Sequence, residues 1–258
     1  MKKLVTLASA VFLGFVASAH AAGDAKHPKA HDWSFEGFDG HFDRAALQRG
    51  FQVYKDVCAA CHGLKYIAFR NLAEIGFSEA EYKAIAAEYI VTDGPDDFGD
   101  MFERPAIPSD YFPSPFANDE QARASNNGAL PPDLSLITKA RADGANYMHA
   151  LLTGYEDPPA DVEMTEGLTY NPYFSGGQIA MVPPLMDDLL EYADGTPATV
   201  EQMSEDVVTF LHWAAEPKME ARKKLGSAVM VFLVIMTILL YLANKKMWAS
   251  VKGKKGDD

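Results

Sequence analysis

The stretch "VCAACHGLKY", residues 57–66, holds the only two cysteines of this 258-residue chain. Cys58 and Cys61 are three positions apart, and His62 directly follows the second. Residues three apart lie on one face of a helical turn, so both thiols are expected to point the same way. The pair is therefore a disulfide, half of a zinc site, a redox-active dithiol, or the attachment point of a covalent cofactor.

The N-terminal residues predict export. Lys2 and Lys3 precede an apolar run over 4–17, and Ala19 and Ala21 are small residues at the two positions that a signal peptidase reads. We expect residues 1–21 to be removed and the mature chain to be exported through a bacterial inner membrane. In an oxidising compartment a lone cysteine pair is bonded or ligated.

A second apolar segment, 225–243, contains no charged residue. At 1.5 Å per residue it reaches roughly 28 Å, enough to cross a bilayer once. Basic residues at 222–224 and aromatic residues beside the other end are typical of a membrane anchor. The lysine-rich tail, 244–258, is expected to stay in the cytoplasm, which leaves the body in the periplasm.

The body, 22–224, has the length of one domain with a sizeable core and carries a net charge of about −18. This acidity argues against nucleic acid as a partner and favours a basic one. The apolar pattern is mainly helical. Helices are expected after Asp43 into the cysteine motif, over 79–90, from an Asp133 cap to 142, in a segment that ends at Gly154, and from Thr199 to the break at 216–217.

Seven prolines fall between residues 91 and 132, so we expect no regular structure there. A loop of this length inside a compact domain usually wraps around something.

The alternatives for the cysteine motif differ in what they require. A structural zinc site needs four ligands, and the six histidines of the mature chain offer no second pair at suitable spacing. A thioredoxin-like dithiol needs a βαβ context, which the pattern lacks. Cys-x-x-Cys-His is typical of c-type haem attachment, in which each thiol forms a thioether and the histidine ligates the iron. We therefore expect one covalent haem c held by Cys58, Cys61 and His62.

A sixth ligand is expected on the far side of the iron. Met181 is the best candidate because "GGQIAMVPPL" places it in a loop flanked by glycines and prolines. His149 is its main histidine rival. Met186, Met203 and Met219 follow helical patterns, where methionine usually fills a core. The remaining candidates are Met101, Met148, Met164, His27, His31, His41 and His212.

Five longer stretches resemble the cytochrome c1 family, the membrane-anchored haem subunits of cytochrome bc1 complexes. They are "RGFQVYKDVCAACHGLKY", "SNNGALPPDLSLITKARADGANY", "LLTGYEDPP", "GLTYNPYFSGGQIAMVPPL" and "DGTPATVEQMSEDVVTFLHWAAEPK". The resemblance runs from about Phe35 to the end of the chain and follows the mitochondrial pattern. The extra cysteine pair of some bacterial members is missing, so no disulfide can brace the Met181 loop.

The resemblance implies a role for several residues. Cys58 and Cys61 match the thioether positions, His62 the proximal ligand and Met181 the distal ligand. Further matched positions are Arg141 and Tyr147 at a haem propionate, Asn126, Pro131 and Pro132 along the haem, where a proline carbonyl orients the His62 ring, and Gly50 and Tyr54 at a helix crossing.

The implied fold is mainly α: a class I c-type cytochrome domain with long irregular loops and one C-terminal transmembrane helix. The implied function is one-electron transfer from a Rieske iron-sulfur protein to a soluble basic cytochrome c, in a dimeric membrane complex with cytochrome b. Two other classes share some of these features. A membrane-tethered cytochrome acting alone has the same haem and anchor, and a haem enzyme or gas sensor needs an open sixth site.

Overall fold

The computed structural model describes residues 25–252, which are mainly helical. The predicted signal sequence, 1–21, lies outside this range, as do the last residues of the tail. The elements in chain order are α2 (Arg44–Asp56), the 3-10 helices η1 (Cys58–Ala60) and η2 (Phe69–Ile75), α3 (Glu79–Ala87), β1 (Ile90–Asp93), β2 (Phe102–Pro105), α4 (Asp119–Ser125), α5 (Ile137–Ala140), α6 (Gly144–Thr153), β3 (Thr169–Tyr170), β4 (Gln178–Ile179), α7 (Val200–Ala215) and α8 (Met219–Lys252).

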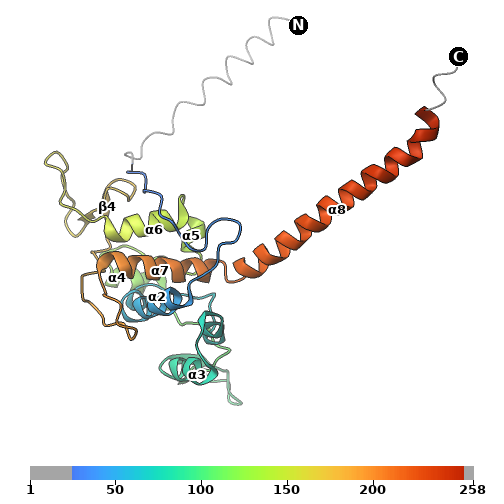
Figure 1. Cartoon of the computed structure of the whole chain (residues 1–258). Helices are drawn as coiled ribbons and strands as arrows, with labels where there is room; N and C mark the ends of the chain where they lie inside the picture. The colour runs from blue at the N-terminus through green and yellow to red at the C-terminus, as the bar shows by residue number, and fades with distance from the viewer. Residues whose placement is uncertain (1–24, 253–258) are drawn as a thin grey trace, which may run out of the picture.

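Helix α7 lies at the centre of the domain, with α2 on one side and α5 and α6 on the other (Figure 1). Helix α2 begins as expected, because the Asp43 carboxylate accepts the backbone N–H groups of Ala45 and Ala46. Its buried side chains Leu47 and Phe51 face α7, whose core-facing residues are buried in turn. The periodic apolar faces of α2 and α7 were therefore predicted correctly.

The two central helices cross at Gly50. A Cβ atom on this glycine would lie 2.0 Å from the carbonyl oxygen of Asp206 and 2.8 Å from Cβ of Phe210. Beside the crossing, the Arg49 guanidinium donates to both carboxylate oxygens of Asp206 at 2.9 and 2.8 Å. Asp206 is buried, so this bidentate pair fixes the register of α2 on α7. The expected close approach at Gly50 is confirmed.

We expect Gly50→Ala to destabilise the domain. Alanine is better than glycine inside a helix by about 1 kcal/mol, but here its methyl group would overlap backbone atoms that cannot rotate away. Overpacking of this kind typically costs about 1–3 kcal/mol. Thermal unfolding followed by circular dichroism should show a lower midpoint, whereas Gly226→Ala, in open space on α8, should not lower the midpoint. A Gly50→Ala midpoint at or above that of the wild type would contradict the close crossing.

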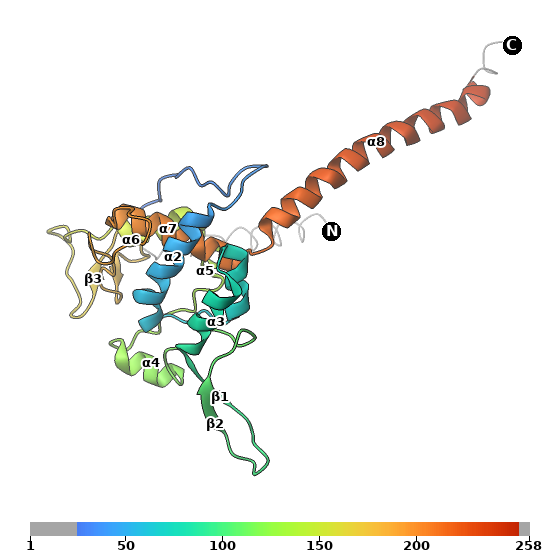
Figure 2. The same cartoon turned by 60° about the horizontal axis from the view of Figure 1, so that its bottom comes forward.

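The segment 91–132 contains more regular structure than its prolines suggest. Strands β1 and β2 pair antiparallel, with Val91 opposite Arg104, and form a hairpin that projects from the domain (Figure 2). The Arg104 side chain donates to Asp93 and Asp110, which closes the base of the hairpin. Helix α4 follows, capped by the Asn118 side chain. The expectation of an irregular loop was therefore wrong for these elements, because cross-strand pairing and a local cap outweigh the prolines.

Helix α8 leaves the domain as a single long rod (Figures 1 and 2). Its segment Met219–Ala249 contains an 18-residue window with a mean hydropathy of 2.5, and none of that window is buried against the domain. The predicted span, 225–243, lies inside this helix. At the domain end, Lys223 Nζ donates to the carbonyl oxygens of Phe35 and Gly37, each at 2.7 Å. The N-terminal segment therefore holds the base of the helix.

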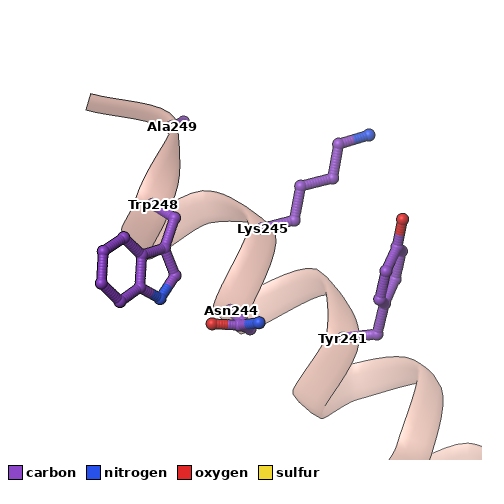
Figure 3. Close-up of a pocket in the computed structure, with 5 residues that line it drawn as sticks. All are labelled: Tyr241, Asn244, Lys245, Trp248 and Ala249. Carbon is purple, nitrogen blue, oxygen red and sulfur yellow. The ribbon is translucent and has the colours of Figure 1, made fainter. Parts of the chain in front are cut away.

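The far end of α8 carries side chains suited to a membrane interface. Figure 3 shows Tyr241, Lys245 and Trp248 extending outward from the helix. Amphipathic aromatic rings and lysines are typical of the boundary between lipid and water. The chain is thus built as a helical domain followed by one exposed apolar helix that is long enough to cross a membrane.

Candidate functional site

The cysteine motif forms a tight turn directly after α2. The backbone N–H groups of Cys61 and His62 both donate to the Cys58 carbonyl, at 3.1 and 2.9 Å. Both cysteines are free thiols, so the disulfide alternative is not realised. Burial, followed by the neighbouring Cys61, raises the pKa of the Cys58 thiol to about 12. A redox dithiol needs a lowered thiol pKa, so this turn does not suit one.

The imidazole of His62 is held in one orientation. Its Nδ1 lies 2.8 Å from the Pro132 carbonyl oxygen. A carbonyl only accepts, so Nδ1 carries the proton and Nε2 keeps its lone pair. Burial lowers the pKa of His62, which favours the neutral ring. The Tyr54 hydroxyl donates to the His62 carbonyl at 3.2 Å. A neutral ring with an orienting hydrogen bond on one nitrogen is the usual form of a metal-binding histidine.

The segment 131–136 is held against the cysteine motif by hydrogen bonds to the backbone of the motif. The N–H of Leu134 donates to the Gly63 carbonyl at 2.9 Å, and the N–H of Lys65 donates to the Asp133 carboxylate at 3.0 Å. The expected role of Asp133 as a helix cap was wrong, because Leu136 is the N-cap of α5. The Asp133 carboxylate instead accepts the N–H groups of Lys65, from the motif loop, and of Ser135, and so fixes Pro132 against His62.

Met181 is half-buried and packs against the same apolar cluster as Cys58 and Tyr147. The alternative histidine ligand, His149, already has partners at both ring nitrogens. Its Nδ1 contacts the Ser204 hydroxyl at 2.9 Å and its Nε2 contacts a Glu201 carboxylate oxygen at 3.0 Å. The methionine rivals are placed elsewhere, since Met203 is fully buried in the core and Met186 is 63% exposed. Met181 therefore remains the best candidate for an axial thioether.

The other expected site residues differ in whether their polar groups already have hydrogen-bond partners. Arg141 is exposed, and its guanidinium donates only to the neighbouring Ala140 carbonyl within the described residues. Burial raises the pKa of Tyr147, and the charge of Arg141 opposes that shift, which places the two groups near each other. Asn126 ends α4, where its side-chain amide donates to the Ala122 carbonyl at 2.7 Å. Arg141 is thus available for an anion, while Asn126 has a local structural role.

These side chains fit a covalently attached haem. Two free thiols share one turn, a neutral imidazole offers one lone pair, and a thioether packs against the same cluster. Large apolar side chains that flank these groups in sequence, Leu130, Leu136 and Val182, are exposed and suit the face of a flat macrocycle. Within the described residues no group of three or more His, Cys, Asp or Glu side chains is arranged to hold a metal ion, which disfavours a zinc site.

Comparison with known proteins identifies the family. The family model described as "Cytochrome C1 family" matches residues 33–251. The chain belongs to the cytochrome c1 family. It is 47% identical to "Cytochrome c1" of Rhodospirillum rubrum over 97% of both chains. It is 50% identical to "Cytochrome b-c1 complex catalytic subunit, mitochondrial" of Candida albicans, over 91% of this chain and 82% of that one.

One relative in the cytochrome c1 family is much longer. The chain is 53% identical to "Cytochrome b/c1" of Bradyrhizobium diazoefficiens over 94% of its own length, but it spans only 38% of that protein. The resemblance predicted from the quoted stretches is therefore confirmed at the level of the family, together with the mainly helical fold and the long apolar C-terminal helix.

Two contacts around the cytochrome c1 motifs were not predicted from the sequence. The Tyr155 hydroxyl donates to the Met181 carbonyl at 3.0 Å, and the Tyr54 hydroxyl reaches the His62 carbonyl. Neither contact has a sequence signal, because each joins residues through the tertiary fold rather than through helical or strand periodicity. Tyr54 was assigned to the helix crossing alone, and its buried ring does lie against Phe210 of α7.

Proposed function

We propose that this chain is the membrane-anchored haem subunit of a cytochrome bc1 complex and carries single electrons from a Rieske iron-sulfur protein to a soluble cytochrome c. The observation that carries the proposal is the motif turn: two free thiols on one turn, followed by an imidazole whose Nδ1 donates to Pro132 and whose Nε2 has no hydrogen-bond partner within residues 25–252. Family membership and the names of relatives, among them heme proteins and a bc1 subunit, support it.

The residues of the site would hold one haem c. Cys58 and Cys61 would attach it through thioethers, and His62 and Met181 would supply the two axial ligands. The bound iron supplies one-electron chemistry by changing between its ferric and ferrous states. With His62 and Met181 both holding the iron, no coordination position would be left for a substrate. A methionine opposite a histidine raises the reduction potential, as an acceptor from a Rieske centre needs.

Arg141 and Tyr147 would bind a haem propionate. A guanidinium donates two parallel N–H groups to a carboxylate, and Arg141 has no ion-pair partner among the described residues. The Pro132 carbonyl would keep the His62 ring in the ligating tautomer throughout the redox cycle. The chain would thus be an electron carrier within an enzyme complex and no enzyme by itself.

The proposed topology follows from both ends of the chain. A cleaved signal at 1–21 would export the domain, and the lysine-rich tail would stay in the cytoplasm. Helix α8 would then cross the inner membrane once and hold the haem domain at the periplasmic face. The neighbours in the membrane would be cytochrome b and the Rieske protein, in a dimeric complex.

Acidic side chains near the Met181 loop would attract the soluble cytochrome c. Glu163 and Glu166 are exposed, and the side-chain amide of Gln178 ties their loop to β4 by bonding the Glu163 carbonyl at 3.1 Å and the Thr165 N–H at 2.9 Å. This contact holds two exposed carboxylates beside the segment that leads to Met181. Complementary charge raises the encounter rate of a brief electron-transfer contact more than buried area does.

Some of the other acidic side chains have structural roles. Asp187 accepts the N–H of Val200 at 2.8 Å and supports the start of α7, and Asp93 is paired with Arg104. Charge reversal at Asp187 or Asp93 would therefore disturb the fold as well as the electrostatic field of the surface. Glu163 and Glu166 are therefore the better test of docking.

We expect Glu163→Lys with Glu166→Lys to slow electron transfer to a basic cytochrome c by roughly tenfold at low salt and to flatten its salt dependence. Reduction of the haem by the Rieske protein should stay near the wild-type rate. Stopped-flow absorbance at several salt concentrations measures both steps. The matched control, Asp97→Lys with Asp100→Lys, makes the same charge change in the β1–β2 hairpin and should have a smaller effect. A wild-type rate that does not depend on salt would rule out steering.

A further inference from the structure

The loop that carries Met181 is tied to the end of α6 at its base. Asn171 is fully buried and lies at the end of β3. Its side-chain amide donates to the Leu151 carbonyl at 2.8 Å, and its backbone N–H donates to the Gly177 carbonyl at 2.9 Å. These two bonds join the last turn of α6 to the β3–β4 turn. They fix where the Met181 segment, residues 177–185, begins.

A second tie reaches Met181 itself. Tyr155 lies two residues beyond α6, and its hydroxyl donates to the Met181 carbonyl at 3.0 Å. The tyrosine is placed by Gly154, where a Cβ atom would lie 2.5 Å from the ring of Tyr173, so only glycine allows this close packing.

The Met181 segment has few other restraints on its backbone. Strand β4 ends at Ile179, and Pro183 and Pro184 have no N–H to donate. Both cysteines of the chain lie in the motif turn, so no disulfide can close this loop. Within residues 25–252, the Tyr155 hydroxyl is the only side-chain group that hydrogen-bonds to the Met181 backbone.

We propose that Tyr155 is a positioning residue for the axial methionine: its hydroxyl holds the Met181 peptide in the place from which the thioether reaches the iron. This inference rests on the proposed function, because it takes Met181 as the axial ligand. Tyr155 touches neither the iron nor a partner in this role and acts only through the Met181 backbone.

The expected effect follows from the free energy of one hydrogen bond. Loss of the bond would favour the open form of the loop by about 1 kcal/mol, which corresponds to roughly a fivefold larger open fraction. Carbon monoxide binds ferrous haem only while the methionine is displaced. Its observed binding should therefore become about five times faster in Tyr155→Phe than in the wild type.

The experiment uses the full-length holoprotein and compares Tyr155→Phe with Tyr173→Phe. The control removes a hydroxyl from Tyr173, a half-buried tyrosine of the same region. Within residues 25–252 this hydroxyl makes no hydrogen bond, and only the backbone N–H of Tyr173 donates, to the Asn171 side chain. In Tyr155→Phe we expect faster carbon monoxide binding, a lower midpoint potential and a weaker far-red absorption band of methionine-ligated ferric haem. Haem content should not change, and Tyr173→Phe should match the wild type.

The outcomes separate the positioning role from the ligand assignment. If Tyr155→Phe matches the wild type while Met181→Leu opens the site, the positioning role is wrong and Met181 ligation stands. If Tyr155→Leu weakens the far-red band but Tyr155→Phe does not, the ring acts only by packing, which also overturns the proposal. If Met181→Leu changes neither spectrum nor potential, the ligand assignment itself fails.

Discussion

Replacing both Cys58 and Cys61 with alanine is expected to remove all covalently bound haem. The two thiols lie on one turn, held by two N–H donors to the Cys58 carbonyl, and they are the only cysteines of the chain. Each single replacement leaves one thioether position, so it should reduce retention without abolishing it. Haem staining of a denaturing gel measures the effect, because only covalently bound haem migrates with the chain.

The double variant needs a control for the amount of protein. An antibody against the chain, applied to the same gel, distinguishes loss of haem from loss of the polypeptide. His62→Ala serves as a second control, since it keeps both thiols and should disturb the spectrum more than covalent attachment. A haem stain that persists in the double variant at the wild-type level would show that the thioether assignment is wrong.

Met181→Leu is expected to lower the midpoint potential by a sizeable part of the roughly 0.8 V range that axial ligands command. Leucine has a similar volume but no sulfur lone pair, so the site should open to water and to carbon monoxide. Met181 is half-buried and packs against the hydrophobic core, so leucine should keep that packing. Potentiometric titration and carbon monoxide difference spectra measure the two effects.

Met186→Leu is the matched control for this prediction. Met186 is five residues further along and 63% exposed, so its replacement should leave the potential near the wild-type value. If the midpoint potential fell strongly in Met186→Leu and did not change in Met181→Leu, Met186 would be the axial ligand in place of Met181. His149 is a weaker alternative, because both of its ring nitrogens already have partners on α7.

The parts of the fold that the sequence predicts well are those governed by periodicity and composition. The apolar faces of α2 and α7, the Asp43 cap and the apolar C-terminal helix each depend on neighbours within a few turns of the same element. The motif around Cys58 is also local. Such features can be inferred from spacing alone.

The features that escaped prediction depend on contacts between distant segments. The β1–β2 hairpin was missed because Pro95 lies in its turn and Pro105 at the end of β2, whereas the bonds from Arg104 to Asp93 and Asp110 have no sequence signal. Asp133 was taken for a helix cap, but its carboxylate accepts an N–H from Lys65, 68 residues earlier. Tyr155 joins Met181 across 26 residues. A polar residue in a loop gives no sequence signal of which distant backbone group it will bind.

The central claim is that this chain carries electrons inside a quinol-oxidising complex. The most direct measurement is to purify the chain from its native membrane in mild detergent, identify the proteins that accompany it, and add a quinol while recording the haem spectrum. We predict that a b-type cytochrome and an iron-sulfur protein copurify and that the quinol reduces the covalent haem, which then reduces added cytochrome c. A chain that purifies alone with its haem, and whose haem a quinol does not reduce, would contradict this account and indicate a solitary tethered cytochrome.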